Sequence, residues 1–353
     1  MSDSGRNSLF AADSRALPRG TQKTLAVTMA AVLAAIGCVD TRIDIPGRVQ
    51  AGTEFVIVDV IDSASVQDVV DRDAGPGSTI SPRPFAPASF ALLQSGSLVV
   101  ADRVRSRILT IPRPDLAAGQ SASSGRLQTS VAGLRDPRCL RVNLFGNVFV
   151  CDADRRRVAV FDAQLREGPP LIIPFESMGL VVGRLSGLAV GAYGDLYVAD
   201  ETNALVYHFD SGGGFMASLG GGAAAGWGRL VRPAGLAIAP DGSQLFICDP
   251  GAGHVAVFDS EGKPLRLFGG NDLKDPRAIA TDRRGQCYVA DPQGKSICVY
   301  SGSGTLSRTI TAASVGIPDW IPCDLALSDS TLWVADEAFG RILMIRVRDT
   351  ASR

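Results

Sequence analysis

Residues 233–270 read PAGLAIAPDGSQLFICDPGAGHVAVFDSEGKPLRLFGG. This stretch contains four short apolar runs, and turns rich in glycine, aspartate and proline separate them. Apolar runs of this length between such turns predict β-strands, and the short turns predict that consecutive strands pair as antiparallel hairpins. The stretch therefore predicts a small four-stranded antiparallel sheet.

The same pattern recurs along the chain, and an aspartate marks the end of the second run in each unit. These aspartates lie 42 to 50 residues apart and are Asp102, Asp152, Asp200, Asp249, Asp291 and Asp336. Four strands in a unit of this length are typical of a β-propeller blade. The strands are almost continuously apolar, as expected where neighbouring sheets cover both faces. We therefore predict an all-β fold, a six-bladed β-propeller of four-stranded antiparallel blades.

The sixth unit lacks a fourth strand, because the chain ends soon after the run at 341–345. An unassigned run, EFVIVDVI at 54–61, precedes the first unit. We predict that this N-terminal strand completes the sixth blade and closes the ring, since closure removes open sheet edges. The expected organisation is a signal segment at 1–38, a linker at 39–84 that contains the closing strand, and the propeller at 85–349.

The units resemble the NHL repeat, a blade type of known β-propellers. The fourth unit carries the resemblance best, with a glycine-rich link around Trp227, Pro-x-Gly at 233–235, ICD at 247–249 and HVAVFD at 254–259. The resemblance extends over 85–349, although the first and last units have drifted from the pattern. The family includes binding scaffolds and some enzymes, so the resemblance implies a fold and leaves the function open.

The N-terminus resembles an export signal. An uncharged apolar run at 25–36 follows three basic residues, and it is too short to cross a bilayer, which needs about 20 residues. The sequence AIGC at 35–38 resembles the lipobox of bacterial lipoproteins, in which Cys38 is lipidated. We expect an exported protein of the bacterial cell envelope, anchored by the lipid on Cys38, with the outer membrane as the favoured site. A periplasmic or secreted protein is the alternative.

Composition and residue counts restrict the function. The formal charge is −1, from 35 Lys and Arg against 36 Asp and Glu, so no overall field attracts nucleic acid. Amidating lyases that resemble NHL propellers hold zinc with three histidines, and this chain has two. Gluconolactonase-like propellers hold a divalent ion with Glu, Asn and Asp, and the sequence picks out no such trio. We predict no cofactor, and an enzyme is the less favoured hypothesis.

Comparison of the units singles out two arginines. Arg138 and Arg277 follow the opening proline in the second and fifth units, where the other units carry small residues. Those two blades lie opposite each other in a ring of six. The guanidinium groups are therefore expected to face each other at the channel mouth and to suit a carboxylate or phosphate. Alternatively, they bridge to Asp136 and Asp275. Trp227 and Trp320 are candidate ligand contacts on the same rim.

The repeat aspartates and the cysteines each allow two interpretations. The aspartates are expected to accept backbone N–H bonds in the following turn; the alternative is a cation site with Asp154, Glu201 and Glu337. Cys139 and Cys151 face each other if the hairpin turns near Phe145, either as two small buried side chains or as a disulfide. The remaining cysteines of the propeller are expected in the core.

The sequence thus favours an envelope-tethered scaffold that binds a protein, peptide or glycan over one rim. We expect a monomer that contacts the membrane through its lipid and binds no nucleic acid. The competing hypothesis is a metal-dependent hydrolase or lyase acting near the channel mouth. A third is a structural spacer without a dedicated ligand.

Overall fold

The structure is a computed structural model that describes residues 55–62, 85–112, 129–168, 179, 181–191, 194–221, 228–328 and 330–347. The chain divides into two compact units, 1–48 and 49–353, and every described residue belongs to the second. The signal segment and Cys38 lie outside the described residues, so their assignment stays a prediction. Within the described part, no helix is long and apolar enough to cross a membrane.

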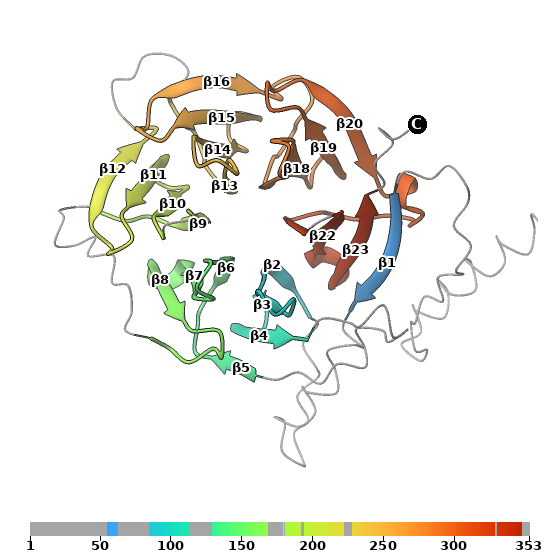
Figure 1. Cartoon of the computed structure of the whole chain (residues 1–353), viewed down its shortest axis with the longest axis horizontal. Helices are drawn as coiled ribbons and strands as arrows, with labels where there is room; N and C mark the ends of the chain where they lie inside the picture. Colours follow the sequence, from blue (N-terminus) through green and yellow to red (C-terminus); the bar gives the residue numbers. More distant parts are fainter. Residues whose placement is uncertain are drawn as a thin grey trace, which may run out of the picture. The chain divides into compact units, whose positions relative to one another are not determined.

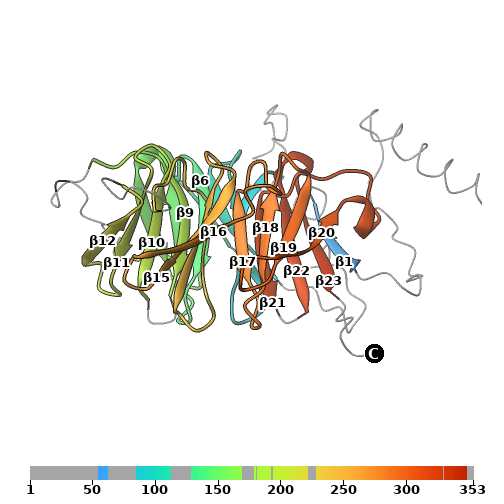
Figure 2. The ribbon, with the colours of Figure 1, turned by 90° about the horizontal axis from the view of Figure 1, so that it is seen from above.

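Six antiparallel sheets stand around one axis as the blades of a propeller (Figure 1), which confirms the predicted fold class. The strands run between two rims of the ring (Figure 2). In chain order the blades consist of β2 (Pro87–Leu92), β3 (Leu98–Asp102), β4 (Arg107–Ile111) and β5 (Thr129–Ala132); β6 (Pro137–Val142), β7 (Val148–Asp152) and β8 (Arg157–Phe161); β9 (Leu185–Val190), β10 (Leu196–Asp200), β11 (Leu205–Phe209) and β12 (Phe215–Leu219); β13 (Leu236–Ile238), β14 (Gln244–Asp249), β15 (His254–Asp259) and β16 (Pro264–Phe268); β17 (Ala278–Thr281), β18 (Cys287–Asp291), β19 (Ser296–Tyr300) and β20 (Leu306–Thr311); and β21 (Asp324–Ser328), β22 (Thr331–Asp336) and β23 (Arg341–Val347) with β1 (Phe55–Ile61).

Blade two differs from the others in its described strands. Five of the sheets have four strands, whereas this sheet shows three, in the order β6-β7-β8. An isolated bridge pairs Phe161 with Glu167 where a fourth strand would begin. Residues 169–178, which follow, lie outside the described part of the chain.

The N-terminal strand β1 lies in the sheet of blade six, consistent with the predicted closure. It pairs antiparallel with β23, from Phe55 opposite Val347 to Ile61 opposite Ile342. Both the first and the last described strands therefore belong to one sheet, as Figure 1 shows where β1 lies against β23. The pairing supplies backbone partners to an edge that would otherwise be open.

The core lies between the blades. One cluster, for example, joins Val99 and Ile108 of blade one to Leu140 and Val150 of blade two. The second strands are buried along their whole length in four blades, and in β14 and β22 all but the first residue is buried, because each strand faces a neighbouring sheet on both sides. This packing explains why the sequence shows continuous apolar runs in place of a strict alternation.

The six repeat aspartates are buried and have the structural role expected of them, but their donors lie mainly elsewhere than predicted. Each accepts backbone N–H bonds from the link that precedes the first strand of its own blade. Asp249, for example, accepts from Val231 at 2.7 Å and from Arg232 at 2.8 Å. Asp200 and Asp291 also accept from the following turn, as predicted. The aspartates therefore fix the links at one rim of the ring.

A candidate ligand site at the channel mouth

A cavity of about 730 Å³ opens on the rim where the links enter the first strands. Residues from all six blades line it, so it lies on the axis of the ring. The residues at the position after the opening proline all belong to this lining: Ala88, Arg138, Ser186, Ala234, Arg277 and Cys323. Equivalent positions in the repeat therefore become neighbours around one cavity, as the unit comparison predicts.

Arg138 is held by a carboxylate from its own link. Its Nε donates to Oδ2 of Asp136 at 2.5 Å. The same oxygen accepts from Nη2 of Arg184, in the link of blade three, at 3.3 Å. Arg184 in turn donates through Nη1 to Glu201 at 3.1 Å. One aspartate thus connects two arginines from adjacent blades.

Arg277 repeats this arrangement in blade five. Its Nε donates to Oδ2 of Asp275 at 2.8 Å, and Arg232 of blade four donates to the other oxygen of this carboxylate at 3.2 Å. The backbone N–H of Gly235 also donates to the carbonyl of Arg277 at 2.9 Å. A Cβ atom on Gly235 would lie 2.5 Å from that carbonyl oxygen, so only glycine allows this approach. The tripeptide Asp-Pro-Arg occurs at both 136–138 and 275–277.

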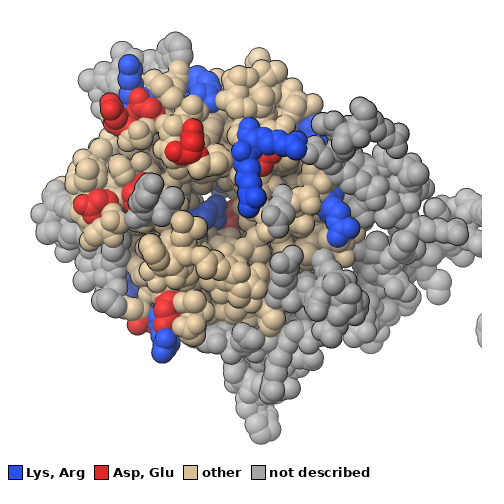
Figure 3. Space-filling model, in the orientation of Figure 1, with Lys and Arg blue, Asp and Glu red and all other residues tan. Residues whose placement is uncertain are grey.

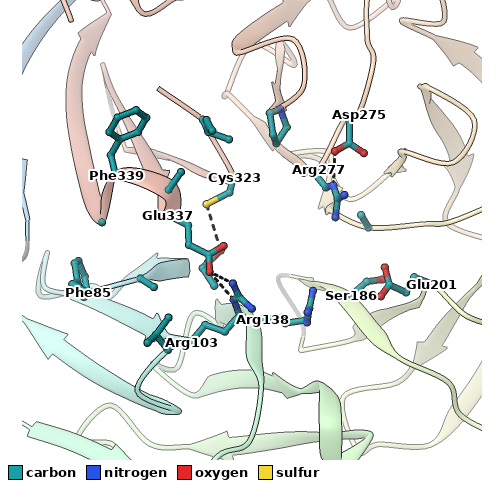
Figure 4. Close-up of a pocket in the computed structure, with 18 residues that line it drawn as sticks. Phe85, Arg103, Arg138, Ser186, Glu201, Asp275, Arg277, Cys323, Glu337 and Phe339 are labelled. Carbon is teal, nitrogen blue, oxygen red and sulfur yellow. Dashed lines mark hydrogen bonds and ion pairs between the residues drawn. The ribbon is translucent and has the colours of Figure 1, made fainter. Parts of the chain in front are cut away.

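The ion pairs leave one end of each of these two arginines available. The aspartates bind the Nε side of Arg138 and Arg277. Within the described residues, Nη1 and Nη2 of both arginines have no hydrogen-bond partner. Figure 4 shows both side chains extending into the cavity from different sides. The salt bridges that the sequence allows are therefore present, and both guanidinium groups also face the cavity.

The cavity wall formed by blades six and one is mainly apolar. Phe85, Val104, Ile321 and Phe339 contribute to it. Phe339 lies in the short 3₁₀ turn η5 (Glu337–Phe339), and its side chain is 49% exposed. Figure 4 places Phe85 and Phe339 on the side away from Arg277. The cavity therefore has an apolar side and a charged side.

One ion pair crosses the apolar side. Arg103 of blade one contacts Glu337 of blade six at 2.6 Å. Burial lowers the pKa of Arg103, but the hydrogen bond and the negative charge of Glu337 outweigh burial and leave the pKa above its ordinary value. Like Glu201 and Glu337, Arg103 directly follows a repeat aspartate, so the repeat position was the signal that could have found it.

Cys323 lines the cavity as a neutral thiol. Its Sγ donates to the carbonyl oxygen of Ala335 at 3.3 Å. Burial raises the pKa of the thiol well above its ordinary value, and the nearby charge of Glu337 adds to this effect. A thiol in this state is a weak nucleophile at neutral pH, because the thiolate is the reactive form.

Neither of the two candidate tryptophans, Trp227 and Trp320, can be placed at the mouth. Trp320 is fully buried between blades five and six, and its Nε1 donates to the carbonyl of Lys295 at 2.8 Å. The prediction that Trp320 contacts a ligand is wrong, because the large ring fills the wedge between two sheets and satisfies its polar atom there. Trp227 lies outside the described residues, as does Cys38.

Cys139 and Cys151 lie directly opposite each other in β6 and β7, in the register that the hairpin rule predicts. Of the two interpretations the structure has the disulfide, with Cα atoms 5.2 Å apart. Cys139 follows Arg138 in sequence and Cys151 precedes Asp152, so the pair joins two strands directly beside the cavity. The other described cysteines are free, and three of the four are buried.

Among the described residues, no three His, Cys, Asp or Glu side chains gather in a group that could hold a metal ion. The carboxylates that line the cavity, Glu201, Asp275 and Glu337, are each bound by an arginine. On the opposite face, Figure 3 shows the charged side chains of the described residues scattered among uncharged ones, without a broad patch of one sign.

Known proteins resemble parts of this chain in sequence. No family model matches it. Protein brain tumor of Drosophila melanogaster is 24% identical over 136 residues, which is 37% of this chain and 13% of that protein. Human E3 ubiquitin-protein ligase NHLRC1 is 30% identical over 90 residues, or 24% of this chain and 23% of that protein. The chain thus matches less than a quarter of the length of either NHL-repeat protein, and both matches support the resemblance of the repeats.

Solved structures share the fold. A putative gluconolactonase has a TM-score of 0.59 at 15% identity, covering 85% of this chain and 93% of that one. A gluconolactonase from Xanthomonas campestris has 0.55 at 16%, covering 75% and 86%. Virginiamycin B lyase from Staphylococcus aureus has 0.55 at 11%, covering 84% and 100%. At these identities the likeness establishes a propeller and no shared activity.

Proposed function

We propose that this propeller is a binding scaffold that receives an anionic group of a protein, peptide or glycan at the channel mouth, between Arg138 and Arg277. The observation that carries the proposal is the pair of guanidinium ends that face one cavity from opposite blades and that no described residue binds. In the cell envelope, the scaffold is held at the membrane by the lipid on Cys38.

The chemistry of the two arginines supports an anionic ligand. A guanidinium presents its donors in a planar fork that matches the two oxygens of a carboxylate or phosphate. Asp136 and Asp275 hold the Nε sides, so little side-chain freedom is lost when an anion binds the other end. Hydrogen bonds between ionised groups are about twice as strong as neutral ones.

The competing proposal is a metal-dependent hydrolase or lyase, and the fold shared with gluconolactonases and a lyase supports considering it. The lining of the mouth favours the scaffold. Each carboxylate there is bound by an arginine, whose positive charge opposes the binding of a cation at the same group. The histidines, His208 and His254, do not belong to the lining.

Thermal unfolding with and without an anion tests the scaffold. Citrate and inorganic phosphate, each compared with sodium chloride at equal ionic strength, are expected to raise the Tm. A ligand at 100 times its Kd stabilises by about 2.7 kcal/mol, which is roughly 4–5 °C for a domain of this size. The double variant Arg138→Gln with Arg277→Gln should lose most of this shift.

The matched control is Arg166→Gln, an exposed arginine in a turn at the opposite rim, which should keep the full shift. An equal shift in all three proteins would refute the site. EDTA distinguishes the enzyme, since removal of a resident divalent ion would lower the Tm of the purified protein and leave a scaffold unchanged. For the anchor, Cys38→Ala should move the protein from the membrane fraction to the soluble fraction.

A further inference from the structure

We infer that the ligand of the channel mouth is a peptide segment in which a carboxylate lies beside a large apolar side chain. This inference rests on the proposed function and names the ligand class for the same site. It follows from three observations: the cavity wall has an apolar side and a charged side, the Nη donors of two arginines face the cavity, and apolar residues are exposed on the same rim.

The cavity wall offers two kinds of contact on different sides. Val104, Ile321 and Phe339 offer the apolar contact surface, and all three come from blades six and one, whereas Phe85 also lines this side but is buried at 1% exposure. The unoccupied Nη ends come from blades two and five, and Figure 4 shows them apart from the phenylalanines. A ligand that fills the cavity must therefore carry an apolar group and an anionic group within one short molecule.

The cavity favours an anion because of the donors that point into it, and not because of its net charge. Three arginines and three carboxylates belong to the lining, so their formal charges cancel. Each carboxylate already accepts from an arginine, whereas the Nη donors of Arg138 and Arg277 have no partner among the described residues. A polyanion such as nucleic acid gains affinity mainly from an excess of positive charge, which this mouth lacks. A neutral glycan would leave the free guanidinium ends without an anionic partner.

Further apolar side chains are exposed at the same rim. Val181 is 81% exposed in the link of blade three, and Val231 is 54% exposed in the link of blade four. Neither valine lines the cavity; both belong to links on the rim at which it opens. Val181 and Val231 would add apolar contact area for the residues that flank the bound carboxylate.

The volume limits what can enter. A cavity of about 730 Å³ lies within the range of sites for small molecules, roughly 300–1,000 Å³. Such a space holds one or two side chains of an extended peptide, and a folded domain cannot enter. The rest of the partner would then lie over Val181 and Val231. The carboxylate can come from an internal acidic residue or from the peptide's own C-terminus, and both offer the same two oxygens.

Four short synthetic peptides test the inference by isothermal titration calorimetry at constant ionic strength. The probes are N-acetylated Gly-Gly-Phe with a free carboxylate, the same peptide as the amide, N-acetylated Gly-Asp-Phe amide, and N-acetylated Gly-Gly-Gly with a free carboxylate. We expect binding of at least one of the two peptides that combine Phe with a carboxylate. Binding of the first alone assigns the carboxylate to a C-terminus, and binding of the Asp peptide alone assigns it to an internal residue.

Variants connect the binding to the two sides of the cavity. Arg277→Gln should weaken the affinity by about tenfold, the typical loss of a charge-assisted hydrogen bond. Phe339→Ala should also weaken it by about tenfold, because it removes apolar contact area. Phe145→Ala is the matched control, since Phe145 is 78% exposed in a hairpin turn outside this cavity. Thermal unfolding of each variant checks that it is folded.

Two results would overturn the inference while leaving the anion site intact. One is equal affinity for the Gly-Gly-Gly and Gly-Gly-Phe carboxylates, which would show that the apolar side adds nothing. The other is a citrate shift in Tm without binding of any peptide. If neither the peptides nor citrate and phosphate act through Arg138 and Arg277, the proposed function fails as well.

Discussion

Asp324 is expected to hold the inner edge of the ring closed. It lies at the start of β21 and is 4% exposed. Its carboxylate accepts from the hydroxyl of Ser89 at 2.5 Å and from Nη1 and Nη2 of Arg141 at 3.2 Å each. Ser89 belongs to blade one and Arg141 to blade two, so one carboxylate connects the last blade with the first two. This contact complements the closure by β1 at the outer edge.

Asp324→Asn keeps the shape and removes the charge. Loss of one partner from a buried ion pair costs about 3–5 kcal/mol. Arg141 is 19% exposed, so water partly compensates and we expect the lower value, about 3 kcal/mol. For a domain of this size that corresponds to a Tm about 5 °C lower. Arg141→Met should cost less, about 2 kcal/mol, because Asp324 keeps the Ser89 hydroxyl and backbone donors.

Urea unfolding followed by tryptophan fluorescence measures both variants and the double variant. If the pair interacts as described, the double variant loses about 2 kcal/mol less than the sum of the single losses. Additive losses, or a loss below about 1 kcal/mol for Asp324→Asn, would refute the assignment of Asp324 as a contact between blades.

Three further predictions concern the disulfide, the closing strand and one histidine. Replacing Cys139 and Cys151 with alanine should lower the free energy of unfolding by about 2–4 kcal/mol. Mass spectrometry of the unmodified sequence after alkylation without reductant measures whether the two thiols are oxidised. Alkylation of both cysteines would contradict the disulfide. Deleting β1 should expose the edge of β23 and give aggregated or unstable protein. A truncation that stops short of β1 should melt at the same temperature as the full chain. Equal melting temperatures of the two truncations would show that closure is dispensable. Burial lowers the pKa of His208, against the opposing charges of Asp195 and Asp210, so the unfolded chain binds the proton more readily. The stability that His208 contributes is thus complete above about pH 6.5, the unfolded value, and is lost as the pH falls toward the lower folded pKa; His208→Gln should lose less stability between pH 7.5 and 5.5, and an equal loss in urea titrations would contradict this.

The repeat unit and the ring followed from the sequence because they depend on local features. Short apolar runs between Gly and Asp turns indicate strands, and their recurrence six times indicates blades. Once blades form a ring, equal positions in the repeat become neighbours, which is why the repeat alone singles out Arg138 and Arg277. The facing of Cys139 and Cys151 follows in the same way from the symmetry of one hairpin.

Other features depend on which segments meet in space. The sequence did not indicate that Asp249 accepts from the link upstream of its own blade, because those donors are 17 and 18 residues away. Tryptophan is a residue type often found in ligand contacts, yet Trp320 is buried because side chains of blades five and six pack around it. Phe339 was missed as a lining residue, because exposure of a turn residue at the cavity depends on how blade six packs.

The sequence by itself determined the number of blades, the order of their strands and the residues that share each level of the ring, since those properties come from periodicity. Only the tertiary structure decided that Asp136 and Asp275 bind the Nε side of the two arginines and leave the other ends toward the cavity. The apolar side formed by blades six and one was likewise decided in three dimensions. The physical reason is that the direction of a side chain depends on its partners from other blades. The sequence pattern of one repeat does not specify those partners.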